Sequence, residues 1–224
     1  MPAILVNSLN FIETASWAAK GVKQHRLSSN QTKAQISVIF AAASLEAFIN
    51  ETADWARQVS NFSSQPDRIM TLAQVLTDAE KSRASVQAKY QLVHWILFSK
   101  AYEQGSNPYQ DFALLMELRN SLMHIKPRPA VISRLESRGL FPNLTDQDFT
   151  QFSGFWTMAI STKQIANWSC HSAASFAVDF LSKVEKDVLD QLNAAENPVS
   201  LFWTGQKREW EAALKNHPHQ HNNR

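Results

Sequence analysis

Glycine and cysteine are scarce in this chain of 224 residues, which has five glycines and one cysteine. Average usage would give about 16 glycines at this length. So few glycines leave few positions for the positive-φ turns that β-sandwiches, barrels and doubly wound sheets need in number. The single cysteine, Cys170, excludes an intrachain disulfide and a thiol cluster for zinc. Because Cys170 lies in a helical pattern, we expect a buried, unreactive thiol.

The chain also lacks a strong excess of either charge, since it has 22 Lys and Arg residues and 20 Asp and Glu residues. This balance excludes a surface that is basic over the whole molecule, but it allows a local basic patch. Five basic residues lie between positions 119 and 138, where Glu136 is the only acidic residue. A solvated helix face would give the same asymmetry.

No long, unbroken hydrophobic run is present. The most apolar window, residues 34–49, has 12 apolar residues in 16 and contains Glu46, so it is too short and too interrupted to span a bilayer. Residues 1–20 lack the basic segment and the apolar run of a secretory signal. We therefore expect a cytoplasmic protein that does not associate with membranes.

Helical spacing of apolar residues recurs along almost the whole chain, and alternation of the strand type is hard to find. This pattern predicts an all-α protein, a bundle of about five to six helices. The second helix is apolar on nearly all sides, which indicates a central position. A short helical pattern over 131–138 ends at Gly139. The expected long helices cover about residues 3–23, 30–62, 66–81, 85–102, 107–126 and 155–192.

Residues 1–197 are expected to form one α-helical domain, because about 150 residues per domain is usual. No repeat of 20 to 50 residues occurs, which argues against a solenoid. Residues 198–224 are expected to form a polar C-terminal tail, in which a short helix can occur. The tail ends in alternating histidines, for which disorder is expected. Trp203 and Trp210 in this tail suggest docking against the bundle or a partner. His94 is expected to be a core or interface histidine. Core packing is expected to explain the other tryptophans, at positions 17, 55, 95, 156 and 168.

Glu46 interrupts the most apolar helix. An unpaired carboxylate among apolar side chains is costly or takes up a proton. Glu46 should therefore have a partner, and Asn50, one turn further on, shares its face. A position at a solvated seam would accommodate Glu46 equally.

A second polar group lies on the helix expected over 107–126. Asn120 and His124 are i, i+4 neighbours on one face, and Arg119 lies about 100° from Asn120. Leucines at positions 115, 118 and 122 form the buried stripe, so the polar residues project from one edge of a packed helix. Basic residues that complement the helix dipole would explain this pattern without any site.

The same residues suit a substrate whose negative charge grows during the reaction, such as a phosphodiester. Arginine holds two phosphoryl oxygens in a bidentate fork, and histidine accepts or donates a proton near neutrality. RNA supplies its own nucleophile, the 2′-hydroxyl, so such a site could cut RNA without a metal or another cofactor. This cleavage benefits from both a base and an acid, and a twofold dimer would place two Arg–His pairs across one cleft.

These residues resemble the HEPN superfamily, helical domains that carry an arginine, four to six residues and then a histidine. Arg119 and His124 fit this spacing with four residues between them, and Asn120 stands where the family often has a polar residue. Residues 44–51 are similar to the second-helix signature of several bacterial HEPN groups, and residues 165–170 resemble their last helix. The resemblance covers roughly residues 30–190.

The resemblance implies a HEPN-like bundle, a homodimer through the helix that carries Arg119 and His124, and often metal-independent endoribonuclease activity. Such ribonucleases commonly act in toxin–antitoxin, phage-defence or RNA-processing roles, so an antitoxin or regulatory protein is an expected partner. Arg119 and His124 would be catalytic and Asn120 would orient them. HEPN toxins paired with a nucleotidyltransferase antitoxin usually have tyrosine two residues after the histidine; Lys126 stands there instead, which argues against that form of regulation.

Supporting roles follow for residues outside the motif. Glu46 is expected to pair with Arg119 from the neighbouring helix, with Asn50 beside it. A basic run is expected to follow the RNA backbone and to make binding depend on salt; it consists of Lys126, Arg128, Arg134 and Arg138. The alternative function is a non-catalytic helical module that binds a protein partner or RNA, since some HEPN domains are not enzymes. No glycine-rich phosphate loop is present.

Overall fold

The computed structural model describes residues 7–23, 27–60, 67–124, 126, 128–140, 156–157, 160–192 and 200–217. Within these residues the chain is all-α, as the sequence predicts, with eight helices and no strand. The helices are α1 (Asn7–Lys20), α2 (Leu27–Ser60), α3 (Asp67–Lys81), α4 (Val86–Phe98), α5 (Asn107–Met123), α6 (Pro129–Ser137), α9 (Lys163–Leu192) and α10 (Ser200–Asn216).

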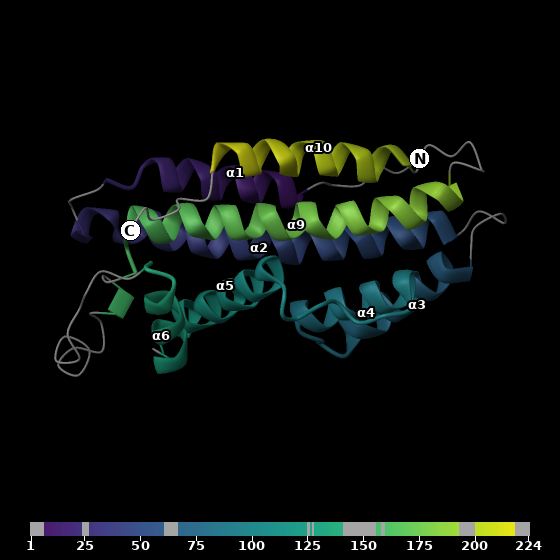
Figure 1. The fold of residues 1–224 in the computed structure, drawn as a ribbon, viewed down its shortest axis with the longest axis horizontal. Helices are drawn as coiled ribbons and strands as arrows, with labels where there is room; N and C mark the ends of the chain where they lie inside the picture. Colours follow the sequence, from purple (N-terminus) through teal and green to yellow (C-terminus); the bar gives the residue numbers. More distant parts are fainter. Residues whose placement is uncertain are drawn as a thin grey trace.

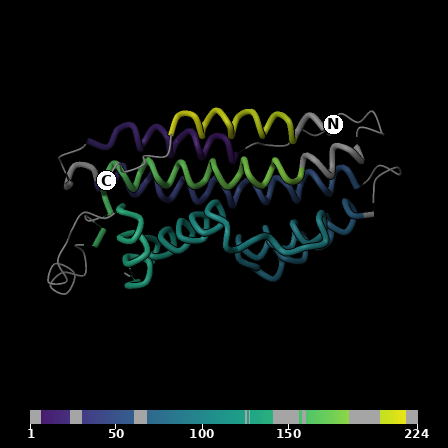
Figure 2. Tube along the Cα trace, in the orientation of Figure 1, coloured from purple at the N-terminus to yellow at the C-terminus, as the bar shows by residue number. Residues whose placement is uncertain are grey.

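The helices form three layers, and two long helices make up the middle one (Figure 1). Helices α2 and α9 lie side by side through the middle, α1 and α10 cover one side of them, and the shorter helices α3 to α6 cover the other side. Figure 2 shows that α10, near the end of the chain, returns to lie next to α1, and the two helices contact each other. The central position of α2 follows from its apolar residues, which cover nearly its whole circumference.

Aromatic rings join the central helices to the lower layer. Phe112 of α5 stacks on Phe176 of α9, with 4.0 Å between ring centroids and 10° between ring planes. Tyr90 of α4 meets Phe176 edge to face at 4.8 Å, and its hydroxyl donates a hydrogen bond of 2.8 Å to the Leu45 carbonyl of α2. These contacts fix α4 and α5 on the same face of the α2–α9 pair.

The ends of α6 follow from local sequence signals. Pro129 stands in the first turn, where its missing N–H costs nothing. At the other end Gly139 adopts φ 67°, and the Leu140 N–H reaches back to the Leu135 carbonyl at 3.0 Å. The predicted helix end at Gly139 is therefore confirmed.

Helix α4 ends at Phe98, about four residues before the predicted end. Ser99 adopts a left-handed conformation with φ 56° and ends the helix. Side chains of α4 then hold the residues that follow: the Gln91 Oε1 accepts a hydrogen bond from the Tyr102 N–H at 2.9 Å, and the His94 Nδ1 lies 2.8 Å from the Lys100 carbonyl. These tertiary contacts replace the helical hydrogen bonds that the spacing predicts.

Helix α9 begins at Lys163, later than the predicted start near residue 155. The Thr162 hydroxyl accepts a hydrogen bond from the Ile165 N–H at 3.1 Å, which is the geometry of an N-cap. Trp156 and Ile160 before this cap are buried and residues 156–157 are helical, so the apolar spacing continues upstream of the non-helical residues 160–162.

The structure has more helices than the five to six expected, because α6 and α10 are complete helices. Helix α10 spans 17 residues of the segment expected to be a polar tail. Trp203 and Trp210 bury their rings, and Trp203 meets Trp55 of α2 edge to face at 4.9 Å. Both tryptophans therefore dock this segment against the bundle. The histidines at positions 219 and 221 lie outside the described residues.

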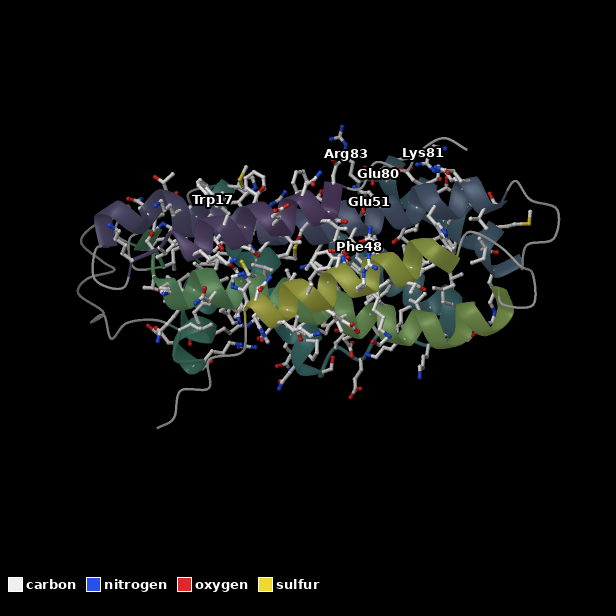
Figure 3. The ribbon with its side chains drawn as sticks, turned by 90° about the horizontal axis from the view of Figure 1, so that it is seen from above. Trp17, Phe48, Glu51, Glu80, Lys81 and Arg83 are labelled. Carbon is white, nitrogen blue, oxygen red and sulfur yellow. The ribbon has the colours of Figure 1, made fainter. Side chains whose placement is uncertain are left out.

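Two tryptophans predicted to be in the core are exposed. Trp17 of α1 is 68% exposed and Trp95 of α4 is 62% exposed, so core packing does not explain them. Both lie on the outer face of a helix in an outer layer, and Figure 3 shows Trp17 on α1. His94 and Cys170 are buried as predicted, and burial raises the pKa of the Cys170 thiol to about 11.

One helical stretch of the described chain, Gln31–Ser60, is long and apolar enough to cross a membrane by length and composition alone. Its apolar window is 56% buried inside the bundle, and the core helix of a soluble protein meets the same criteria. The window of residues 34–49 considered from the sequence is only part of this helix. The cytoplasmic location stays a prediction.

Candidate functional site

The candidate site lies where the second half of α5 faces α2. The Arg119 Nη2 is 3.2 Å from the Glu46 Oε2, and the Arg119 Nη1 donates a hydrogen bond of 3.1 Å to the Asn120 Oδ1. The predicted pairing of Arg119 with Glu46 is therefore confirmed. The Arg119 side chain is 29% exposed and that of Glu46 is 39% exposed, so the pair sits at a solvated seam between helices.

The sequence of α5 places this pair at an edge. Leu115 and Leu118 are fully or almost fully buried against the core, and Ser121 is buried with its hydroxyl donating to the Glu117 carbonyl at 2.9 Å. Arg119 and Asn120 fall between the buried stripe and solvent, and both are half-buried. Their guanidinium and amide groups are thus oriented by the helix and remain accessible.

His124 is the residue at which α5 ends. Its backbone N–H donates to the Asn120 carbonyl at 3.1 Å, while φ of −99° and ψ of 0° take the chain out of the helix. The imidazole is exposed, next to Met123, which is 56% exposed. Five residues of helix place His124 about 7.5 Å beyond Arg119 along the axis. Arg119 and His124 thus share one accessible helix end but do not contact each other through a hydrogen bond.

Among the described hydrogen bonds Asn50 makes none with Glu46, although it lies one turn away on α2. Its Oδ1 accepts a hydrogen bond of 3.0 Å from the Lys89 ammonium of α4. Lys89 is only 6% exposed and also forms a short ion pair with Glu80 of α3. Lys89 carries the same sequence signal as Glu46: no other Asp, Glu, Lys or Arg interrupts the apolar segment of α4.

Two arginines of the basic run attach α6 to α5. The Arg134 Nη1 lies 2.9 Å and 2.8 Å from the two carboxylate oxygens of Glu117, and the Arg138 Nε lies 2.8 Å from the Asp111 Oδ1. Asp111 precedes Glu117 on α5, and its partner Arg138 follows Arg134 on α6. The two pairs therefore run in opposite directions along the two helices, as antiparallel packing requires. These two side chains therefore hold the short helix in place.

The other two basic residues of the run are open to solvent. Lys126 and Arg128 are exposed on the connection between α5 and α6, directly after His124. The basic run therefore divides into two anchored side chains on α6 and two accessible ones beside the end of α5.

A groove of about 400 Å³ opens on the other side of Glu46, between α1 and α2. Its charged lining is acidic, with Glu46, Glu51 and Asp54, and Phe11 contributes an apolar wall. Two of these carboxylates are paired with cations outside the groove, Glu46 with Arg119 and Asp54 with Arg57. The described lining of the groove offers no cation to a polyanion, whereas Lys126 and Arg128 beside the end of α5 do.

Glu51 in this groove caps α1 from a neighbouring helix. Its carboxylate accepts hydrogen bonds from the N–H of Asn7 at 2.6 Å, the N–H of Ser8 at 2.8 Å and the Ser8 hydroxyl at 2.6 Å. Burial raises the pKa of Glu51 more than these hydrogen bonds lower it. Glu51 therefore caps the first turn of α1, and its carboxylate oxygens are occupied by these hydrogen bonds.

Metal-ligating side chains do not cluster in the described ranges: no group of three or more His, Cys, Asp or Glu residues there could hold an ion. No protein-family model matches this sequence, and no curated protein and no solved structure was found to match it. The likeness to HEPN domains accordingly rests on residues 44–51, 119–124 and 165–170 of this chain.

Proposed function

We propose that the chain is a HEPN-like, metal-independent endoribonuclease that cleaves single-stranded or loop RNA. The observation that carries the proposal is the end of α5, where Arg119 is oriented by Glu46 and Asn120 and His124 is exposed beyond it. An oriented guanidinium and a titratable imidazole on one accessible helix end suit a reaction that builds negative charge at phosphorus.

Arg119 retains the donors that a phosphate clamp needs. A guanidinium has five N–H donors, and the hydrogen bonds to Glu46 and Asn120 use two of them. The remaining donors are enough for a bidentate contact with two phosphoryl oxygens. Glu46 then acts as a positioning residue that sets the plane of the fork.

In the proposed step the RNA 2′-oxygen attacks the adjacent phosphorus, so that the P–O2′ bond forms and the P–O5′ bond breaks. A neutral His124 takes the proton of the 2′-hydroxyl, and a protonated histidine gives a proton to the departing 5′-oxygen. In a twofold dimer this acid is His124 of the partner subunit. The products are a 2′,3′-cyclic phosphate and a 5′-hydroxyl, and no electron acceptor is needed.

RNA binding is proposed along the exposed connection between α5 and α6. Lys126 and Arg128 offer positive charge there, while Arg134 and Arg138, paired with Glu117 and Asp111, contribute the N–H donors that these pairs leave unused. Each phosphate that these side chains neutralise steepens the dependence of log affinity on log salt by about 0.7 for a single strand. A role in a toxin–antitoxin or phage-defence system belongs to the same proposal.

The direct test is cleavage of total RNA by the purified protein in the presence of a chelator. Cleavage should be lost in His124→Ala and kept in Lys20→Gln, an exposed cation on α1 in the opposite layer. Wild-type protein that cuts RNA no faster than His124→Ala would contradict the proposal.

The alternative function, a non-catalytic interaction or RNA-binding module, is favoured by one observation. Met123 is 56% exposed beside His124, and an exposed apolar side chain there suits a protein contact. This alternative predicts that Arg119→Ala weakens the dimer in sedimentation while no RNA is cut. Tight RNA binding without turnover would favour an RNA-binding module.

A further inference from the structure

A second cavity of about 360 Å³ lies between α2, α3 and α4, apart from the Arg119 pair. This volume falls within the range of about 300 to 1,000 Å³ that is typical of small-molecule pockets. Ala53 contributes accessible apolar lining, with the buried Ile49 and Leu76 behind it, and Thr77 stands among the polar residues. The pocket thus combines an apolar surface with polar groups from three helices.

Lys89 is the most unusual side chain in this lining. It is 6% exposed, and its ammonium donates to the Asn50 Oδ1 at 3.0 Å and forms a short ion pair with Glu80. An ammonium has three N–H donors, so these two acceptors leave one donor unused among the described residues. A buried donor without an acceptor is costly, and an acceptor in the pocket would satisfy it.

Among the residues that line the pocket, cations outnumber anions by one, although Asp78 outside the lining pairs with Lys81. Arg57 is neutralised by Asp54, and Lys89 is neutralised by Glu80. Lys81 also lines the pocket; its nearest carboxylate, 3.8 Å away, belongs to Asp78, which lies outside the lining. The Lys81–Asp78 pair is weak because its side chains are 73% and 58% exposed, so an anion in the pocket can replace Asp78 as the partner of Lys81.

We propose that this pocket binds a small organic anion, whose phosphate or carboxylate group is held by Lys89 and Lys81 and whose apolar body rests against Ala53 and the alkyl chain of Lys81. In Figure 3 Glu80 lies between Arg83 and Lys81, and the Arg83 side chain projects away from the bundle. Arg83 therefore provides a matched cation outside the pocket. The proposal is independent of RNA cleavage, because it concerns other residues and a different ligand.

The experiment titrates the full chain by calorimetry with phenyl phosphate, benzoate, benzylamine and inorganic phosphate as separate probes. Phenyl phosphate or benzoate should bind, and the comparison of the two identifies the anionic group that the pocket prefers. Inorganic phosphate, which has no apolar body, should bind more weakly. Benzylamine, with the same ring and the opposite charge, should not bind.

Three variants and a control locate the binding. Lys81→Gln should weaken it roughly tenfold, because a charge-assisted contact is lost. Lys89→Met should abolish it, and Thr77→Trp should abolish it by filling the pocket while both lysines stay. Arg83→Gln should leave it unchanged. If Lys89→Met does not fold, the other two pocket variants still decide.

The proposal is overturned if neither aromatic anion binds at millimolar concentration. It is also overturned if benzylamine binds as tightly as phenyl phosphate, or if binding survives both Lys81→Gln and Thr77→Trp. RNA cleavage does not enter any of these outcomes, so this inference and the proposed function can fail separately.

Discussion

Replacing Arg119 with methionine separates its role in stability from its role in the proposed reaction. Methionine keeps an unbranched side chain that can cover the same apolar surface, and it removes the guanidinium. The lost ion pair with Glu46 joins side chains that are 29% and 39% exposed. Solvent screens such a pair, so its loss lowers the free energy of unfolding by only about 1 kcal/mol.

The cost in stability stays small because the partners of Arg119 are not stranded. Glu46 is exposed enough to be hydrated after the substitution, and Asn120 is half-buried with the same access to water. In the reaction, by contrast, the guanidinium would face the negative charge that grows at phosphorus. Removing one such donor costs about 10²- to 10³-fold in rate.

Two assays on the same preparation test this separation. Urea denaturation of Arg119→Met should give nearly the wild-type midpoint, while initial rates on a fluorescent RNA should fall about 10²- to 10³-fold. Arg119→Lys should fall in between, because lysine restores the charge without the planar fork. An unchanged cleavage rate, or a loss of unfolding free energy above about 3 kcal/mol, would refute the reasoning.

Three further predictions concern the fold that carries the site. Glu51→Ala leaves the Ser8 hydroxyl and two N–H groups of α1 without their acceptor, and should lower the free energy of unfolding by about 2 to 4 kcal/mol in urea. Burial raises the pKa of Glu51 above 4.5, so as pH rises Glu51 ionises in the unfolded chain before it ionises in the folded one. The extra free energy of unfolding of the wild type over Glu51→Ala should therefore be full below pH 4.5 and shrink as pH rises through the raised pKa. A difference that grows with pH would contradict this. Gly139→Ala, at φ 67°, should cost about 1 to 2 kcal/mol in thermal unfolding, and an unchanged melting temperature would argue against the left-handed cap. The buried Cys170 thiol, with its pKa raised to about 11, should react with a thiol reagent at mildly alkaline pH only as the protein unfolds, whereas rapid labelling of the native protein would contradict its burial.

Helix ends that depend on local signals could be predicted from the sequence. Gly139 and Pro129 mark the limits of α6, and Pro108 marks the first turn of α5, because each acts on its own backbone. The end of α4 could not be predicted in this way. There Ser99 leaves the helix while Gln91 holds the following residues through a side-chain contact that no spacing rule describes.

Part of the site could likewise be predicted from single residues. A carboxylate on an apolar helix needs a partner, and this reasoning names Asn50, one turn further on; the pairing of Glu46 with Arg119 that the structure shows is expected only from the roles that the HEPN resemblance implies. The same reasoning applies to Lys89, whose partners lie on two other helices. The engagement of Arg134 with Glu117 depends on the antiparallel packing of α6 on α5, which follows only from the folded structure.

Exposure of single aromatic residues was the least predictable feature. Trp17 and Trp95 fall in helical apolar patterns, yet each is more than half exposed. Trp203 and Trp210 lie in a polar segment, where two isolated aromatic residues indicate docking, and they are buried against the bundle as expected. Periodicity shows which residues share a face of a helix, but which face another helix covers depends on packing partners distant in sequence.

The central claim is that His124 and the RNA 2′-hydroxyl together cleave the RNA strand, and one measurement tests it most directly. The substrate is a single-stranded RNA incubated with the protein and a chelator, alongside the same RNA with a 2′-deoxy nucleotide at the cleaved position. The account predicts a 2′,3′-cyclic phosphate end from the first RNA, no cut at the substituted position of the second, and neither product with His124→Ala. Cleavage at the 2′-deoxy nucleotide, or equal cleavage by His124→Ala, would contradict the account.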